Sequence, residues 1–517
     1  MKILLIDPPM QSIMLARADW YPMSLSYLAG SAVAEGHDVL IYNGEHDKDL
    51  DYVNLTTYSN NYHLYPEALN NVDHYAWEKY KKILSQYKPD IIGITAFSVK
   101  FPSALRIAAI SKDYNPTVPV IMGGQHTTIM TDQVLNDKNI DFAVRGEGEQ
   151  TFIEFIHQFE SNKSWPSIDG LCYKQNKRII KNKNRELIEN IDNIAYPSKE
   201  TLYDLENYSE TSLSKLFASR GCPYQCTYCG TQNIWTNKVR FHSPERIINE
   251  IKQTKKDFGC TYFTFFDDVF GLHKKNTYHL LDKMIESNLN INWDCLTRAN
   301  LVSDELLIKM KNAGCKKIDM GVESGSDKIL LDTKKGVNKK QILRGAKLVK
   351  KHKLMLYMFF MIGLPTETED DVKETKKFLK LLKPDWAGIS IFTPIPGTEI
   401  YNELIEENFI DEKPDFAKFS HQSPNSNFAF NMGVREDFPA LAKETIEFIQ
   451  NYNGSLGNLI RRGMSRGYLK NPKLFLFDFV KLLTWKGIMT RSHQTSHTKF
   501  YSKSDTTTTP QKTFLIR

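Results

Sequence analysis

Three cysteines crowd into one short stretch of the chain. Cys222, Cys226 and Cys229 are separated by three and then two residues. Thiolates are soft ligands, and three on one loop can bind three irons of a 4Fe–4S cluster, which leaves the fourth iron without a protein ligand. A tetrahedral zinc site is the alternative, but zinc needs a fourth ligand, and the nearest following histidine, His242, lies thirteen residues beyond the last cysteine. The spacing therefore favours an iron–sulfur cluster with one open iron.

The other cysteines stand alone. They share no close spacing with one another or with the triad: Cys172, Cys260, Cys295 and Cys315. Isolated cysteines behave most often as small buried hydrophobic residues, so we expect no second cluster. The N-terminal sequence has no secretory pattern, and no stretch of 18 consecutive apolar residues occurs, which predicts a cytoplasmic protein.

Two series of elements must position this loop. In the first 160 residues, short apolar runs bounded by Gly, Pro, Asp or Asn predict strands at 3–6, 39–42, 91–97, 118–122 and 142–144. Amphipathic segments between them predict helices at 25–34, 75–86, 102–113 and 149–159. Such a βαβ series predicts a doubly wound, Rossmann-like parallel sheet. The polar residues 47–73 interrupt the series as an expected insertion or mobile loop.

A second alternating series follows a predicted hairpin and connector. Its expected strands are 216–218, 262–266, 291–295, 317–320, 355–362 and 388–392. Six βα units are too few for a full eightfold barrel and therefore predict a partial, open (βα)6 barrel. The fold class is α/β, with predicted domains at 1–165 (sheet), 166–213 (hairpin and linker), 214–400 (barrel), 401–500 (mainly helical) and 501–517 (disordered tail).

The cysteine loop after the first barrel strand resembles the radical SAM superfamily. The resemblance implies that S-adenosylmethionine (SAM) chelates the open iron and that reduction yields a 5′-deoxyadenosyl radical. Tyr228 matches the superfamily's aromatic residue before the last cysteine. Strand ends further along imply that the SAM contacts include Asp267, Arg298, Glu323 and Ser324. Asp267 departs from the pattern, because many relatives have Gly-Gly-Glu there.

The first series resembles the cobalamin-binding domain found in one branch of this superfamily. The matching segments are 7–9, 21–29, 36–39, 88–93, 123–126 and 145–149. Ligands of such sheets lie beyond the carboxyl ends of the strands. The resemblance thus implies a cobalamin site formed by Asp7, Thr95, Ser98, Gly123, Gly124, His126, Gly146 and Glu147.

One departure from cobalamin domains concerns the cobalt ligand. Domains that ligate cobalt through histidine carry D-x-H-x-x-G, which this chain lacks. A histidine in a turn, such as His126, is more often a hydrogen-bonding residue, so we expect cobalamin without a lower protein ligand. The alternative is a sheet that keeps the scaffold and has lost the cofactor.

These resemblances imply an oxygen-sensitive enzyme with a 4Fe–4S cluster, SAM and cobalamin. The leading hypothesis is methyl transfer to an unactivated carbon of a small-molecule or lipid-like substrate, with flavodoxin or ferredoxin as electron donor. A second hypothesis is radical cyclisation or rearrangement of an apolar or porphyrin-like substrate, as in anaerobic porphyrin cyclases. A third, from another class, is a non-catalytic module that binds or senses the cofactors.

The charge of the chain is concentrated near its end. The net charge is +6, and residues 455–517 hold 12 basic side chains against two acidic ones. Residues 461–491 combine these bases with large apolar side chains, which predicts a helix docked on the barrel or, alternatively, peripheral contact with an anionic membrane. Nucleic acid is not an expected partner, because no RNA-binding motif accompanies the charge.

Overall fold

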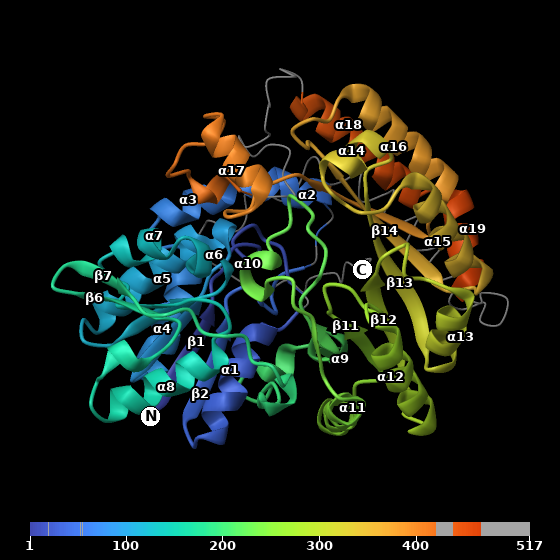
Figure 1. The fold of residues 1–517 in the computed structure, drawn as a ribbon. Coiled ribbons are helices and arrows are strands. Elements are labelled where there is room, and N and C mark those ends of the chain that lie inside the picture. Colours follow the sequence, from blue (N-terminus) through green and yellow to red (C-terminus); the bar gives the residue numbers. More distant parts are fainter. Residues whose placement is uncertain (19, 52, 54, 420–437, 467–517) are drawn as a thin grey trace, which may run out of the picture.

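The computed structural model describes the whole chain except residues 19, 52, 54, 420–437 and 467–517. Two α/β units lie side by side, with the N-terminal unit in blue to cyan and the second in green to orange (Figure 1). The predicted basic helix at 461–491 and the predicted disordered tail fall mostly outside the described residues. In the part of the chain that is described, no helix is both long and apolar enough to cross a membrane.

The N-terminal unit is built on a seven-stranded sheet. Its first five strands are parallel: β1 (Lys2–Asp7), β2 (Asp38–Asn43), β3 (Ile91–Thr95), β4 (Val120–Gly123) and β5 (Phe142–Val144). The order β2-β1-β3-β4-β5 reverses direction between β1 and β3, which makes the sheet doubly wound, as predicted. The predicted hairpin, β6 (Leu171–Gln175) and β7 (Arg178–Lys181), pairs antiparallel with β5 and extends this same sheet.

Alternating side chains of the strands fill two cores. Leu5 of β1 packs on one face with α1 (Met23–Ala34) and α8 (Glu149–Glu160), whereas its neighbours Leu4 and Ile6 pack on the other. That second face is covered by α4 (Tyr75–Tyr87) and α5 (Phe101–Tyr114) (Figure 1). Period-two alternation with apolar residues on both faces is what a sheet covered on both sides requires.

Residues 47–73, predicted as an insertion or a mobile loop, form an insertion that is largely helical. It contains α2 (Leu55–Asn60), a 3-10 turn and α3 (Leu64–Asn70). Tyr58, Tyr62 and Tyr65 are buried and pack into the core that contains Trp77. The average polarity of the segment concealed these tyrosines, whose rings supply the apolar face of the helices.

The second unit is an open barrel of six parallel strands. These are β8 (Lys215–Leu216), β11 (Tyr262–Phe265), β12 (Asn292–Thr297), β13 (Cys315–Glu323), β14 (Met355–Ile362) and β15 (Trp386–Ile391). Sequential strands are neighbours, and the two outer strands, β8 and β15, do not pair with each other. The outer helices are α11 (Pro244–Phe258), α12 (Lys274–Glu286), α13 (Asp304–Asn312), α15 (Lys339–Lys351) and α16 (Glu369–Leu382). The predicted partial barrel is therefore confirmed.

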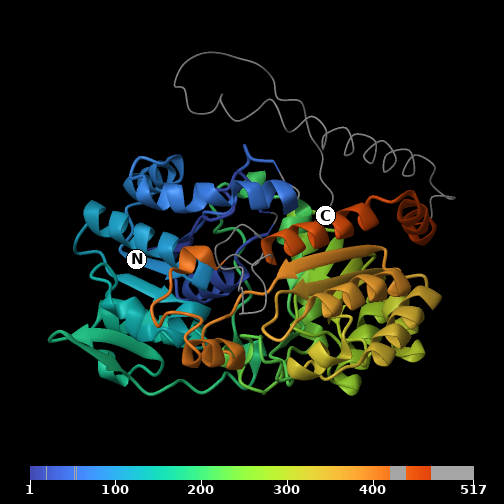
Figure 2. The same ribbon diagram turned by 90° about the horizontal axis from the view of Figure 1, so that it is seen from above.

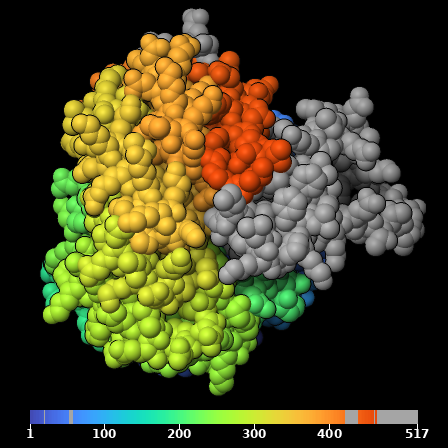
Figure 3. All heavy atoms as spheres, turned by 90° about the vertical axis from the view of Figure 1, so that its right-hand side faces the viewer, coloured from blue at the N-terminus to red at the C-terminus, as the bar shows by residue number. Residues whose placement is uncertain are grey.

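The chain after the barrel first returns to the N-terminal unit. The segment that starts with α17 (Glu399–Glu406) lies beside the N-terminal unit (Figures 1 and 2), and its turn at Phe416–Lys418 contacts α5. The ring centroid of Phe416 in this segment lies 6.3 Å from that of Phe101 and 4.7 Å from that of His126. The helices α18 (Phe438–Asn453) and α19 (Leu456–Arg466) then lie back against the barrel, where they form one face with α15 and α16 (Figure 3). Crossing twice in this way ties the two units together.

Candidate active site

The three cysteines lie on a loop that starts and ends in one small antiparallel pair. β9 (Ser219–Arg220) precedes the loop, and β10 (Arg240–Phe241) follows it and pairs with β9. Gly221 opens the loop with a φ of +101°, and a Cβ there would overlap the Lys238 carbonyl oxygen. Only glycine combines this conformation with so close an approach. The backbone of Thr227 is fixed to Thr333 by a hydrogen bond of 3.1 Å.

The cysteine thiols are partly exposed and free of disulfides. Burial raises the pKa of Cys222 to about 11 and also raises that of Cys229. Ligation by iron would offset this cost, because metal binding favours the thiolate. Among the described residues, no group of three or more His, Cys, Asp or Glu side chains is placed as ligands of a single metal ion would be. A 4Fe–4S cluster is larger than one ion and needs its cysteines further apart.

Arg298, at the end of β12, reaches the cysteine loop. Its guanidinium lies 3.6 Å from the ring centroid of Tyr224, and Nη1 lies 4.0 Å from Sγ of Cys226. It also donates a hydrogen bond to the backbone oxygen of Lys335. The structure thus brings this predicted residue to the loop, where its positive charge favours anionic ligands.

A lysine that the sequence analysis missed lies beside Arg298. Nζ of Lys335 is 2.6 Å from Oε1 of Glu323 and 3.3 Å from the hydroxyl of Tyr228. Glu323, the last residue of β13, has a φ of +64°, a conformation that a residue with a side chain adopts at a cost of order 1–3 kcal/mol. Lys335 follows another lysine in a short loop, so neither its type nor its spacing marked it in the sequence.

Two of the predicted SAM residues are occupied elsewhere. The carboxylate of Asp267 accepts hydrogen bonds from the backbone of Ala218 and the hydroxyl of Ser219, and burial raises its pKa to about 6. Ser324 is fully buried, 3.2 Å from the hydroxyl of Thr375 on α16. The carboxylate that faces the loop is instead Asp268, which accepts a 3.2 Å hydrogen bond from Thr231.

A cavity of about 410 Å³ lies between the two units. The sheet unit contributes apolar side chains and five glycines, which lie within β3, at the end of β4 and in the loop after β5. The second unit contributes Phe266 and Asp268 and, between β9 and β10, Gly230 and Trp235. Of the residues predicted to bind cobalamin, five line it: Thr95, Gly123, Gly124, Gly146 and Glu147. At Gly146 a Cβ would meet nothing within 4 Å, so the wall there is open to a flat ligand. A mainly apolar cavity of this size is typical of small-molecule and cofactor sites.

His126 is shut away from this cavity. Its Nδ1 lies 3.0 Å from Oγ of Ser98, and its ring packs between Phe101 and Phe416. The ring is fully buried, and burial lowers its pKa to about 3. Neither His126 nor Ser98 lines the cavity.

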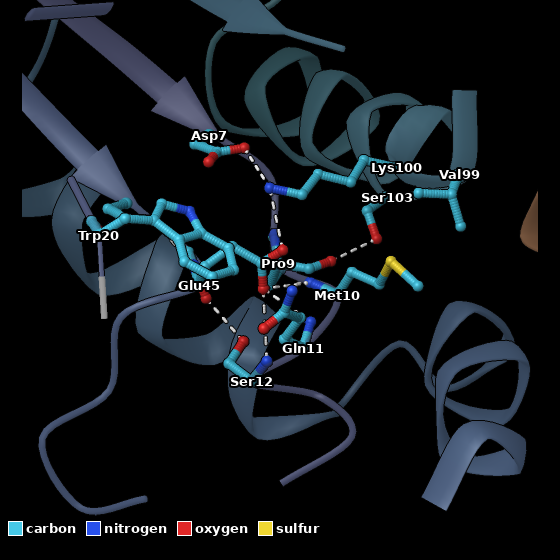
Figure 4. Close-up of polar contacts among 12 residues, drawn as sticks. Asp7, Pro9, Met10, Gln11, Ser12, Trp20, Glu45, Val99, Lys100 and Ser103 are labelled. Carbon is cyan, nitrogen blue, oxygen red and sulfur yellow. Dashed lines mark hydrogen bonds and ion pairs between the residues drawn. The ribbon is translucent and has the colours of Figure 1, made fainter. Parts of the chain in front are cut away.

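Asp7 also lies outside the cavity, in a buried ion network shown in Figure 4. Nζ of Lys100 is 2.6 Å from Asp7 and 2.9 Å from Glu45. The other oxygen of Glu45 accepts hydrogen bonds from the backbone of Met10 and Gln11. Burial raises the pKa of Asp7 against the opposing effect of Lys100. The network shapes the turn after β1, so Asp7 supports this edge of the sheet without facing the cavity.

The fold and the site together define a class of protein. A cluster-type cysteine loop opens an incomplete barrel, and a doubly wound sheet of the cobalamin-domain type faces it across a shared cavity. A model of the radical SAM superfamily matches residues 216–379, and a model of the B12 binding domain matches residues 14–156. An uncharacterized methyltransferase of Pyrococcus horikoshii is 33% identical over 79% of this chain and 84% of its own length. The chain belongs to the radical SAM superfamily and carries a B12-binding domain.

Other relatives and solved structures agree with this assignment. An anaerobic magnesium-protoporphyrin IX monomethyl ester cyclase of Rubrivivax gelatinosus is 26% identical over 82% of this chain and 73% of its own. The radical SAM methyltransferase TsrM of Kitasatospora setae, solved with cobalamin and a 4Fe–4S cluster, superposes with a TM-score of 0.64 at 15% identity, covering 87% of this chain and 88% of its own. The predicted cofactors, a 4Fe–4S cluster, SAM and cobalamin, are those of this family.

Proposed function

We propose that this protein is a cobalamin-dependent radical SAM methyltransferase that acts on an unactivated carbon of a small molecule. The observation that carries the proposal is that the cysteine loop and the sheet share one cavity. Gly230, next to Cys229, contacts Gln125 so closely that a Cβ there would overlap the Gln125 amide. Residues of the cluster loop therefore lie directly against the cobalamin-type domain, as transfer between two cofactors requires.

The residues of this chain divide the work of holding the cofactors. Cys222, Cys226 and Cys229 hold the cluster, and Lys335 and Arg298 supply positive charge beside it for the carboxylate of SAM. When bound, the cluster and SAM supply a radical that abstracts hydrogen, and cobalamin supplies the methyl group. The apolar walls of the cavity exclude water, which protects radical chemistry from side reactions. Asp268 is our candidate for the amino group of SAM in place of Asp267.

The partners follow from the chemistry. The cluster needs an external one-electron donor, for which flavodoxin or ferredoxin is suited. The proposed substrate is a small or lipid-like molecule. For the basic C-terminal residues we propose docking on the barrel or, alternatively, contact with an anionic membrane, and nucleic acid is not part of the proposal.

A labelling experiment separates methyl transfer from ring closure. Protein reconstituted anaerobically with iron, sulfide and hydroxocobalamin is incubated with a metabolite extract, a chemical reductant and SAM that carries a trideuteromethyl group. We expect mass spectrometry to find a metabolite that gains the labelled methyl group, and only when hydroxocobalamin is present. A product that loses hydrogen without gaining label would instead favour cyclisation, and no change with SAM left intact would favour a non-catalytic module.

A further inference from the structure

One carboxylate of the sheet unit holds both ends of the cluster loop. Arg220 of β9 and Arg240 of β10 are direct partners in the antiparallel pair that closes the loop. Nη1 of Arg220 lies 3.0 Å from Oε1 of Glu147, and Nη1 of Arg240 lies 2.7 Å from Oε2 of the same side chain. We call these three residues the Glu147 clasp. Glu147 comes from the loop after β5, so the clasp joins the two units.

The clasp is buried, and both carboxylate oxygens of Glu147 are paired with guanidinium groups. The side chains of Glu147, Arg220 and Arg240 are 1%, 6% and 8% exposed. Two neighbouring guanidinium groups repel each other, and at this depth their charge must be balanced by a nearby carboxylate. Burial alone would lower the pKa of Arg220, but Glu149, whose Oε1 lies 2.7 Å from Nη2, and Glu147 raise it. Glu147 is the carboxylate that both guanidinium groups share, so it balances charge on both strands of the pair.

Two of the three clasp residues also line the cavity. Glu147 and Arg220 line the cavity, whereas Arg240 does not. Arg240 instead donates a second hydrogen bond, of 2.7 Å, to the backbone oxygen of Ile188. Arg220 is separated from Cys222 by Gly221 alone. Any ligand that orders the wall at Glu147 thus acts within a few residues of the first cluster cysteine.

We propose that Glu147 is a positioning residue that couples cobalamin binding to cluster binding. When cobalamin fills the cavity, the wall at Glu147 is fixed; Glu147 then fixes β9 and β10, and so the two ends of the cluster loop. By thermodynamic linkage the effect is reciprocal, so the assembled cluster must tighten cobalamin binding by the same factor. The inference rests on the proposed function only in taking cobalamin as the ligand of the cavity.

The variant Arg240→Gln tests the coupling at a residue that does not itself line the cavity. The dissociation constant of hydroxocobalamin is measured by absorbance for the apoprotein and for the cluster-loaded protein. In the wild type we expect the cluster to tighten hydroxocobalamin binding about 5-fold or more, which is the lower end of typical allosteric coupling. In Arg240→Gln we expect the two dissociation constants to differ by less than about twofold. Arg185→Gln is the matched control, since Arg185 pairs with Glu154 on α8, away from the loop, and it should keep the wild-type ratio.

A second measurement follows the stability of the cluster itself. Release of iron to a ferrous chelator is followed for wild type, Glu147→Gln and Arg240→Gln, with and without hydroxocobalamin. We expect hydroxocobalamin to slow release in the wild type and to have a much smaller effect in the two variants. A wild-type protein that binds hydroxocobalamin with no dependence on the cluster overturns the clasp and leaves the proposed function intact. If the wild type binds no hydroxocobalamin, the cobalamin part of the proposed function fails, and release from Glu147→Gln at the wild-type rate then overturns the clasp as well.

Discussion

Lys335 and Glu323 form a 2.6 Å ion pair beside the cysteine loop. The lysine ammonium is also 3.3 Å from the hydroxyl of Tyr228, the residue just before the last cysteine. Glu323 therefore fixes a positive charge beside the cysteine loop, where we propose that the carboxylate of SAM binds. Its strained backbone, with a φ of +64°, is of the kind that persists where the surroundings over-determine a functional residue.

The variant Glu323→Ala is expected to weaken SAM binding about tenfold or more while the cluster survives. Loss of a hydrogen bond to a charged group costs about 1.5–3 kcal/mol, and here it would release Lys335 from its position. Calorimetric titration of SAM into the reconstituted protein measures the change. Glu374→Ala is the control, because Glu374 pairs with Lys339 at an exposed site. Normal SAM affinity in Glu323→Ala would show that Glu323 and its ion pair with Lys335 do not contribute to SAM binding.

The variant Gly221→Ala is expected to impair cluster assembly. A Cβ at this position overlaps the Lys238 carbonyl oxygen in a left-handed conformation, so the loop entrance must shift. Gly36→Ala is a matched control, because Gly36 has a φ of +85° but no atom within 4 Å of its added Cβ. Iron content after identical reconstitution should fall well below one cluster per chain in Gly221→Ala alone. An equal loss in both variants would attribute the effect to backbone strain in general.

His126→Ala is expected to leave the electronic state of bound cobalamin unchanged. The imidazole packs between two phenylalanine rings and lies outside the cavity, so it is not positioned to reach cobalt. The paramagnetic resonance spectrum of the cob(II)alamin form should show no nitrogen splitting from a protein histidine, and the variant should give the same spectrum. Splitting that disappears in His126→Ala would make it a ligand.

Asp267 is expected to make stability fall as the pH rises from about 4 to about 6. Burial raises the pKa of its carboxyl in the folded protein to about 6 from the ordinary value of 3.8, so the folded protein keeps a proton that the unfolded chain has released. The shift corresponds to roughly 3 kcal/mol in unfolding free energy. Urea unfolding at several pH values, for wild type and Asp267→Asn, isolates this contribution as a difference that grows across the window. A constant difference would show that the carboxyl titrates normally.

The sequence predicted the regular strands and helices of both units, but it missed the helical insertion and the contacts between distant segments. The strands of both units followed from apolar runs such as 91–97 and 355–362, because parallel strands buried on both faces carry an unmistakable composition. The helices at 55–70 were missed, since three scattered tyrosines supply their buried face. The return of Phe416 to the first unit could not be read at all, because contacts between distant segments leave no local pattern.

Some residues of the candidate site could also be predicted from the sequence, and others could not. The cysteines, Arg298 and Glu323 were readable because a motif or a strand end marks each of them. Lys335 was not, since its role depends on the position of Glu323 twelve residues earlier. Asp267 was predicted to contact SAM, but Asp268 is the carboxylate that faces the loop. Which of the two adjacent carboxylates turns toward the loop depends on the hydrogen-bond donors of Ala218 and Ser219, which hold Asp267.

The most direct test of the account is the metal content of the anaerobically reconstituted protein, combined with its response to SAM. One 4Fe–4S cluster per chain is expected from iron and sulfide analysis, and its reduced form should give a paramagnetic resonance signal that shifts when SAM is added. Cys226→Ala should lose both the cluster and the shift. The assignment as a radical SAM enzyme with one cluster would be contradicted by zinc in place of iron, by two clusters per chain, or by a cluster signal that does not change when SAM is added.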